Sequence, residues 1–327
     1  MQIVTNPLKI SAPTGGSCVT WGNFDGVHLG HQKLLKHVVS KAHKQGLAAV
    51  AITFFPHPLE VLGAPPPIIT CMKDKLALMA DLGLDLTIVL PFTGKVSKLE
   101  PEDFVRHVFT GALNTREIVM GYSSFFGRVR RGSATLLANM GRSLGFKTEQ
   151  LSPLLAEGSV VSSTRVRKLI AAGDVELASR LLGRNYFIEG TVAKGRGLGR
   201  ELGFPTLNIL PELNILPDWS QGSQMRPGQK KSMAMLPGFG VYSGYTEINN
   251  ALHPSVLSIG TNPTFEKSHG MLEPVLEVHI LDFNQNLYEK KVRIHFQSFL
   301  RPMHKFESVN QLKFQIAEDI KQAREIM

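Results

Sequence analysis

The chain has 327 residues, of which 43% are hydrophobic and 19% are charged. A single core stops growing at roughly 250 to 300 residues, so we expect two domains; the composition excludes wholesale disorder and a lone small binding module. The 36 Lys and Arg residues exceed the 27 Asp and Glu residues, and the net charge of +9 favours phosphorylated ligands, nucleic acid or anionic membranes without choosing among them.

The first residues, MQIVTNPLKISAPTGG, contain no apolar core after a basic start, and the sequence has no apolar run near the 18 residues that a membrane span needs. We therefore expect a cytoplasmic protein with no membrane partner. The cysteines, Cys18 and Cys71, are 53 positions apart and belong to no CxxC pattern, so the sequence predicts neither a disulfide framework nor a zinc site.

From Ser17 onward, short apolar runs alternate with segments of helical period, which is the pattern of strand and crossover helix. Four continuous runs are expected to be strands covered on both faces: CVTW, LAAVAITF, LDLTIVLPF and REIVMG. Helices are expected over the stretch that holds Leu34 to Ala42 and near residues 73–82, 102–113, 133–144 and 163–182. The pattern therefore predicts an α/β domain with an open parallel sheet at residues 1–183.

The segment from Gly22 to His31 leaves the first strand and enters a predicted helix, with His28 and His31 three residues apart at the helix N-terminus. A helix N-terminus favours anions, and glycines let the backbone approach a phosphate closely. The histidines can donate hydrogen bonds to the charge that develops on the phosphates, which predicts nucleotidyl transfer. Ordinary surface histidines are the alternative. The candidate catalytic residues are His28 and His31, and the candidate ATP-binding residues are Gly22, Asn23, Asp25 and Gly30.

Two further segments of this domain are candidates for the same site. TFFPHP, residues 53–58, follows a strand where α/β sheets place ligands, so His57 is either a ligand contact or part of a structural turn. SSTRVR, residues 162–167, opens a predicted helix, and its hydroxyls and guanidinium groups can hold phosphate oxygens and neutralise pyrophosphate. A plain N-cap with a solvated basic face is the alternative. The candidate ATP-binding residues here are Ser163, Thr164, Arg165 and Arg167.

Residues 184–327 show a different pattern, in which strand-like pieces follow one another without intervening helices. The pieces are YFIEGTVA, FGVYSGYTEI, SVLSIG, VLEVHILDF and YEKKVRIHF. They predict an antiparallel sheet or barrel. A last helix is expected after Ser308, which has Gln311 at capping-box spacing, and its apolar stripe is expected to cover or plug one side of the barrel. Residues 211–237 predict a long exposed loop without assigned chemistry.

A second candidate site lies early in this domain. Three glycines alternate with basic residues at 194–200, and GFPTLN follows at 203–208. The glycines can cradle a polyphosphate through backbone amides, although GxxxxGK[ST] is absent, and a flexible turn is the alternative. Thr206 and Asn208 lie two apart on an extended segment, so both can present oxygens to Mg2+ and a nucleotide phosphate. The candidate ATP-binding residues are Gly195, Gly199, Thr206 and Asn208, with Thr206 as the metal ligand.

Glu277 stands on a predicted strand that is otherwise mostly apolar. It shares a strand face with His279, opposite to Val278 and Ile280. A carboxylate in this setting can act as the general base that takes a proton from an alcohol while a γ-phosphoryl group is transferred. An exposed carboxylate paired with a nearby lysine is the alternative.

In the order of these motifs the chain resembles the prokaryotic bifunctional riboflavin kinase/FMN adenylyltransferases, also called FAD synthetases. The motifs are GNFDGVHLGHQ, TFFPHP, VVSSTRVR, LLGRNYFIEGTV, GFPTLN, SIGTNPTF and LEVHILDF, and they extend over nearly the whole chain. The resemblance implies an HxGH nucleotidyltransferase domain with a Rossmann-like parallel sheet at 1–183 and a riboflavin kinase barrel of six antiparallel strands at 184–327. It also implies that both domains use ATP as co-substrate with Mg2+.

By this resemblance, riboflavin is phosphorylated at its ribityl 5'-hydroxyl, with Glu277 as base and with Thr206 and Asn208 near Mg-ATP. FMN then attacks the α-phosphorus of a second ATP, which gives FAD and pyrophosphate. The resemblance puts His28, His31, Ser163, Thr164 and Arg167 around those phosphates. Riboflavin, FMN and ATP are therefore the expected partners, nucleic acid is not, and the oligomeric state stays open.

Ser123 and Ser124 depart from the family pattern, in which an acidic or amide residue is followed by an aromatic residue. This departure is the basis of an alternative, a riboflavin kinase with a degenerate adenylyltransferase domain. Leu207 and Glu289 replace a usual Ala and a usual Gly, and neither change removes a proposed catalytic group. A third interpretation, a non-catalytic regulator that contacts nucleic acid, has little support because the sequence shows no helix-turn-helix, RNP or zinc pattern.

Overall fold

The computed structural model describes residues 1–6, 10–63, 65–128, 131–195, 198–212, 214, 233–261 and 274–327. The described chain forms two compact units, the first from Met1 to Ser162 and the second from Ser163 onward. Several predicted features lie outside the described residues: Arg196 and Gly197 of the glycine loop, residues 262–265 of SIGTNPTF, and most of the loop expected at 211–237.

The first unit is built on a parallel sheet of six strands within the described residues, in the order β1-β4-β3-β2-β5-β6. The strands are β1 (Gln2–Val4), β2 (Ser17–Trp21), β3 (Ala48–Phe55), β4 (Leu86–Pro91), β5 (Thr115–Met120) and β6 (Lys147–Gln150). The predicted parallel α/β sheet is confirmed. The sequence did not mark β1 and β6, because these short edge strands carry no continuous apolar run.

Helices cover both faces of this sheet. Successive strand residues point to opposite faces, and every residue of β2 is buried, so both of its faces are covered. On one face, Leu35 and Val38 of α1 pack with Cys18 and Ala49 of the central strands. The helices of the unit are α1 (Leu29–Lys44), α2 (Pro58–Val61), α3 (Met72–Ala80), η2 (Val96–Lys98), α4 (Pro101–Phe104), the π-helical η3 (Val105–Ala112) and α5 (Ala134–Leu144). A small hairpin, β7 (Leu155–Ala156) and β8 (Ser159–Val160), follows the sheet.

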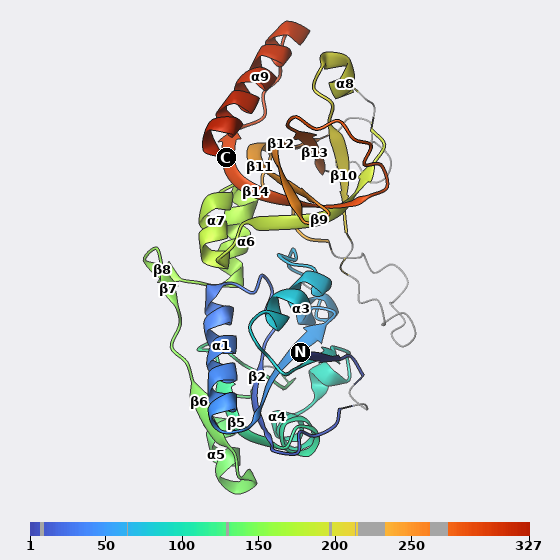
Figure 1. Ribbon diagram of the computed structural model, residues 1–327. Helices are drawn as coiled ribbons and strands as arrows, with labels where there is room; N and C mark the ends of the chain where they lie inside the picture. Colours follow the sequence, from blue (N-terminus) through green and yellow to red (C-terminus); the bar gives the residue numbers. More distant parts are fainter. Residues whose placement is uncertain are drawn as a thin grey trace. The chain divides into compact units, whose positions relative to one another are not determined.

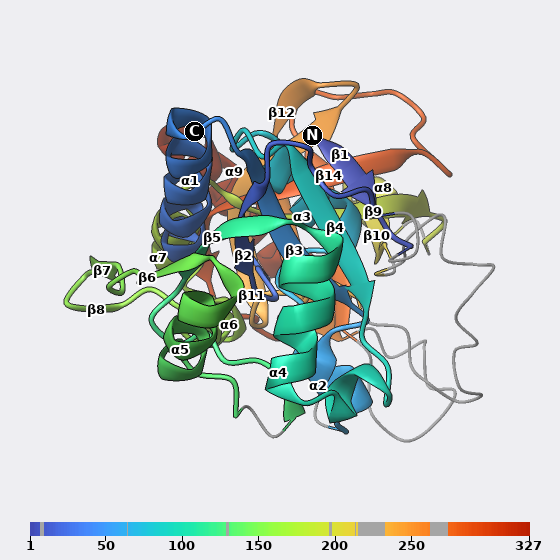
Figure 2. The same cartoon turned by 90° about the horizontal axis from the view of Figure 1, so that it is seen from below.

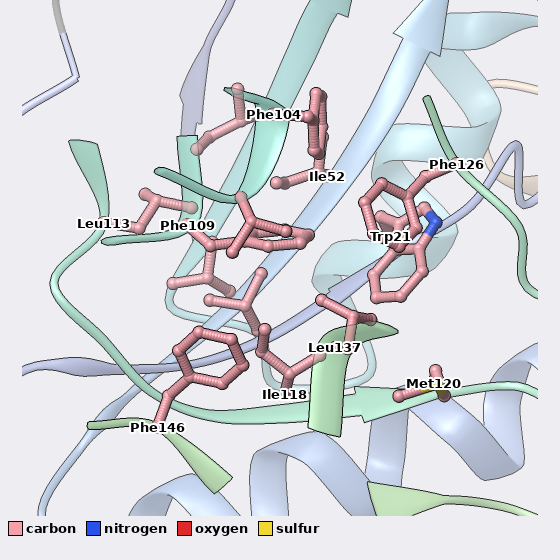
Figure 3. Packing of buried hydrophobic residues seen from close by; sticks show 14 of the residues in the cluster. Trp21, Ile52, Phe104, Phe109, Leu113, Ile118, Met120, Phe126, Leu137 and Phe146 are labelled. Atoms are coloured by element: carbon pink, nitrogen blue, oxygen red, sulfur yellow. The ribbon is translucent and has the colours of Figure 1, made fainter. Parts of the chain in front are cut away.

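The opposite face carries an aromatic core. Trp21 of β2 contacts Phe126 with ring centroids 5.2 Å apart at 76°, and Phe104 contacts Phe109 at 5.3 Å and 89°. Such edge-to-face pairs add to the stabilisation that apolar burial provides. Figure 3 shows these rings closing around Ile52 of β3. The helical segment that begins with α4 runs over this face of the sheet (Figure 2).

The second unit begins with two helices, α6 (Ser163–Ala172) and α7 (Val175–Leu182), where the sequence predicted one. Gly173 has a positive φ of 83°, and the Asp174 side chain accepts a hydrogen bond from Leu177 N at 3.0 Å. A left-handed glycine ends a helix, and an aspartate N-cap starts the next one. Because α7 then packs on the strands that follow, both helices belong to the second unit. The predicted boundary at Gly183 stays a prediction.

The rest of the second unit is a closed antiparallel barrel in the order β10-β13-β12-β11-β14-β9 (Figure 1). Its elements are β9 (Tyr186–Ala193), α8 (Leu198–Leu202), β10 (Leu207–Pro211), β11 (Gly240–Ile248), β12 (Ala251–Thr261), β13 (Pro274–Ile280) and β14 (Lys291–Arg301). Alternate residues such as Tyr186, Leu257, Val278 and Phe296 are buried inside it. The predicted six-stranded barrel is confirmed.

The last helix, α9 (Val309–Ile326), covers the barrel only with its C-terminal half. Ser308 caps it as predicted, and its hydroxyl accepts from Gln311 N at 3.2 Å. Asp319, 3% exposed, accepts two hydrogen bonds of 2.8 Å from Arg301 of β14. Val309, at the start of the predicted apolar stripe, is 57% exposed. Within the described residues, no helix combines the length and the apolarity that a membrane crossing requires.

Candidate active sites

The two predicted histidines lie together at the N-terminus of α1. His28 is the N-cap residue, and its Nδ1 accepts a hydrogen bond from His31 N at 3.3 Å. A neutral imidazole that accepts at Nδ1 carries its proton on Nε2, so His28 is a donor at that atom. The two rings stack with centroids 3.6 Å apart at 18°. This arrangement suits the stabilisation of negative charge at a helix N-terminus.

Gly30 leaves room for the stacked rings. A Cβ at this position would lie 3.2 Å from His28 Nδ1 and 3.5 Å from Val161 O. Gly22 is confined in a similar way, because its Cβ would lie 3.2 Å from the Phe24 ring. At both positions a side chain would make an unusually close contact, so glycine favours close packing around the loop.

Asp25 holds the loop to the segment that precedes α3. Its carboxylate is 3% exposed and accepts from Ile69 N at 3.1 Å and from Thr70 N at 3.2 Å. Asn23 lies near His57, with its Nδ2 3.2 Å from the ring Nε2. The structure thus brings Asn23 and His57 together and gives Asp25 backbone partners, while their contact with ATP stays a prediction.

Lys75 on α3 is a residue that sequence reasoning missed. Its side chain is buried, and its Nζ donates to Asn23 O at 3.0 Å and to Thr53 Oγ1 at 3.2 Å. Burial lowers the pKa of Lys75 to about 8, and the nearby Asp25 carboxylate opposes that shift. A signal was present, since Lys75 stands in helical register with the buried Met72 and the other apolar residues of α3.

The loop that contains Ser123 and Ser124 is held by hydrogen bonds between its own residues. Ser124 Oγ accepts from Gly121 N at 3.1 Å, and Ser124 N donates to Gly121 O at 3.2 Å. Phe126 packs on Trp21 in the aromatic core, while Phe125 is 48% exposed. The Ser124 hydroxyl is therefore used to close the turn.

The predicted phosphate-binding residues of SSTRVR lie in the first five residues of α6. Val166 of this stretch is buried, so its side of α6 packs against the protein, whereas Thr164 is exposed. The group consists of Ser163, Thr164, Arg165 and Arg167, all in the second unit. Their joint action with the histidines stays a prediction.

In the barrel, Glu277 of β13 lies between two polar neighbours. It pairs in register with Asn208 of β10 on one side and with Ser258 of β12 on the other. Directly opposite residues in an antiparallel pair share a face, and here it is the outer face, because Leu276 and Val278 are buried inside. Partial burial raises the pKa of Glu277 above its usual value.

The glycine loop lies against the same polar residues. A Cβ on Gly195 would overlap the Asn208 amide, with Asn208 Cγ only 2.9 Å away. A Cβ on Gly199 would lie 3.0 Å from Thr206 Oγ1. The structure therefore places Gly195 against Asn208 and Gly199 against Thr206, and Asn208 lies opposite Glu277; we call these four residues, 195, 199, 206 and 208, the glycine cradle, and their contact with ATP stays a prediction.

His279 supports the segment that leads into the cradle. Its Nδ1 donates to Pro205 O at 2.8 Å, and its ring meets Phe204 edge-on with centroids 6.0 Å apart. The sequence placed His279 on the face of Glu277 without a role. The contact is between residues 74 positions apart and becomes visible only in the barrel.

Two family models match the chain. A model described as FAD synthetase matches residues 10–165, and one described as riboflavin kinase matches residues 182–327. The first therefore includes the histidine motif and the start of α6, and the second includes the glycine cradle and Glu277.

Curated relatives are similar over nearly the full length. Proteins named bifunctional riboflavin kinase/FMN adenylyltransferase are 33% identical in Buchnera aphidicola, covering 98% of this chain and 97% of the relative, and 33% identical in Bacillus subtilis, covering 98% and 96%. The Escherichia coli relative of the same name is 32% identical over 99% and 97%. A crystal structure from Streptococcus pneumoniae, described as a macrolide-efflux protein, matches with a TM-score of 0.82 and 27% identity over 99% of this chain and 98% of that one.

Proposed function

The chain belongs to the bifunctional riboflavin kinase/FMN adenylyltransferase family, and we propose that it carries out both reactions of flavin cofactor synthesis. ATP phosphorylates riboflavin to FMN, and a second ATP transfers its adenylyl group to FMN, which gives FAD and pyrophosphate. The observation that carries the proposal is the match of both family models, one after the other, in a chain whose relatives align from end to end.

In the kinase reaction, Glu277 takes the proton from the ribityl 5'-hydroxyl as that oxygen attacks the γ-phosphorus of ATP. The raised pKa of Glu277 supports this role, because a carboxylate with a higher pKa is a stronger base at neutral pH. Gly195 and Gly199 let the loop backbone approach the phosphates, and Asn208 orients them beside Glu277. Catalysis of phosphoryl transfer consists mostly of such positioning.

The cradle also fits Mg2+. Thr206 and Asn208 offer a hydroxyl and an amide oxygen, which are hard donors of the kind that Mg2+ prefers, and Glu277 lies opposite Asn208. Thr206 is the proposed protein ligand, and the ion, when bound, neutralises charge on the transferring phosphoryl group.

In the adenylyl transfer, His28 and His31 donate hydrogen bonds to the phosphate oxygens of ATP while FMN attacks the α-phosphorus. The Nε2 proton of His28 and the helix N-terminus support this role. Gly22, Asn23, Asp25 and Gly30 shape the loop around the nucleotide. For Ser163, Thr164, Arg165 and Arg167, the proposal rests on their sequence at the start of α6, where hydroxyl and guanidinium groups suit pyrophosphate.

We assign the adenylyl transfer to residues 1–183 and the kinase to residues 184–327, and we locate both reactions in the cytoplasm. The kinase-only alternative is less favoured, because the FAD synthetase model matches residues 10–165, most of the first unit, and the bifunctional relatives align over 98% of the chain. Two variants test the assignment. Glu277→Gln should strongly reduce conversion of riboflavin to FMN but still make FAD from added FMN, and His28→Ala should do the reverse. An unchanged FAD rate in His28→Ala would exclude the proposed site.

A further inference from the structure

Lys75 presents a buried cation beneath the loop that carries the two histidines. The side chain is 6% exposed, yet within the described residues it forms no direct salt bridge, although the Asp25 carboxylate is close enough to raise its pKa. Its hydrogen-bond acceptors are a backbone carbonyl and a hydroxyl, Asn23 O and Thr53 Oγ1. A buried ammonium group held only by neutral acceptors is costly for folding, so its presence calls for a functional reason.

The contacts of Lys75 lead step by step to His31. Thr53 Oγ1 also donates to Asn23 O at 3.2 Å, so the Asn23 carbonyl is held by two donors. The next residue, Phe24, is left-handed with a φ of 49°, a conformation that persists only where its surroundings impose it. The Phe24 ring is 1% exposed and meets the His31 ring edge-on at 5.3 Å.

We propose that Lys75 is a positioning residue for adenylyl transfer: its ammonium group fixes the Asn23 carbonyl, which holds Phe24 against His31 and keeps the imidazole pair stacked. This inference rests on the proposed adenylyltransferase function. Lys75 touches neither substrate nor reacting atoms in this scheme. On the other flank of Phe24, the Asp25 carboxylate holds the loop through backbone amides, so the strained residue is fixed from both sides.

The test compares Lys75→Met with Lys73→Met in the full-length protein. Both variants remove one positive charge from α3, but Lys73 is exposed. FAD formation from FMN, ATP and Mg2+ should fall about 10- to 100-fold in kcat for Lys75→Met, the range for loss of a hydrogen bond from a charged group. KM for FMN should change little, and Lys73→Met should match the wild type. FMN formation from riboflavin should be normal in both variants.

Thermal unfolding separates positioning from a merely structural role. Removing a buried cation whose hydrogen-bond acceptors are neutral should leave the melting temperature of the first unit unchanged or raised in Lys75→Met, although its FAD rate falls. A loss of FAD synthesis accompanied by a clear drop in melting temperature would overturn the proposal, and so would a wild-type FAD rate. Thr53→Val, which keeps the side-chain shape and removes one donor to Asn23, should lose about 2- to 10-fold in kcat.

The pH profile gives a further readout. The charged and titratable groups around Lys75 are Asp25 on the loop, Asp74 on its own helix, and His57 beyond the Asn23 amide. Because the ammonium form is a stronger donor than the neutral amine, FAD formation in the wild type should decline as pH rises through about 8, and this decline should be absent in Lys75→Met. An identical decline in both proteins would contradict the proposal. A wild-type protein that makes FMN but no FAD would instead refute the adenylyltransferase function itself.

Discussion

Gly195→Ala is expected to damage the kinase while leaving the adenylyltransferase intact. The added Cβ would lie 2.9 Å from Asn208 Cγ, whereas two carbon atoms are best separated by about 3.5 to 4.0 Å. The Asn208 amide must therefore move by about 1 Å, away from its place opposite Glu277 on the outer face of the barrel. Misplacement of about 1 Å can cost on the order of 100-fold in rate. We expect kcat/KM for riboflavin to fall about 10- to 100-fold.

The assay follows FMN formation from riboflavin and ATP, with FAD formation from added FMN measured in the same preparation. The second rate should be unchanged, which also shows that the first unit is folded. Gly94→Ala is the matched control, since a Cβ there meets nothing within 4 Å and both rates should stay at the wild-type level. A Gly195→Ala protein with normal kinase activity would refute the idea that the glycine loop and Asn208 form one cradle.

Three further outcomes are expected. The kinase rate should rise with pH through an apparent pKa above the ordinary value of a glutamate, because Glu277 has a raised pKa and acts as the deprotonated base. In Glu277→Gln this rise with pH should be absent, and the rate should fall about 100- to 10,000-fold. Gly30→Ala should lower FAD formation but not FMN formation, since the Cβ would press on the His28 ring at 3.2 Å. Asp319→Ala should reduce the free energy of unfolding of the barrel unit by on the order of 3 kcal/mol in urea titrations, because it leaves Arg301 without its bidentate partner; a loss below 1 kcal/mol would show that α9 is not held by this pair.

The central strands of the parallel sheet could be predicted because strands buried on both faces read as continuous apolar runs. The edge strands β1 and β6 could not, since half of their residues face solvent and leave no run. The break between α6 and α7 depends on the left-handed Gly173, which a helical period alone does not reveal. The apolar stripe of α9 was correctly seen, but the barrel covers only its C-terminal half, and the length of that contact is a tertiary property.

Some residues of the candidate sites could likewise be predicted from the sequence, and others could not. His28, His31 and the glycine cradle could be found because their chemistry requires particular residues at short spacings along the chain. The pairing of Glu277 with Asn208 needed the barrel register, which no local pattern supplies. The helical register of Lys75 with the buried residues of α3 indicated burial but not its contact, because the acceptor is a backbone carbonyl that is distant in sequence, and such an acceptor is present at every residue.

The most direct test of the account is a time course with the purified protein, riboflavin, ATP and Mg2+, with the flavins separated by chromatography. The account predicts that FMN rises first and then gives way to FAD, since the product of the kinase is the substrate of the adenylyltransferase. FMN that accumulates without FAD would contradict the bifunctional assignment and leave the kinase alone. A folded protein that forms neither product would contradict the account as a whole.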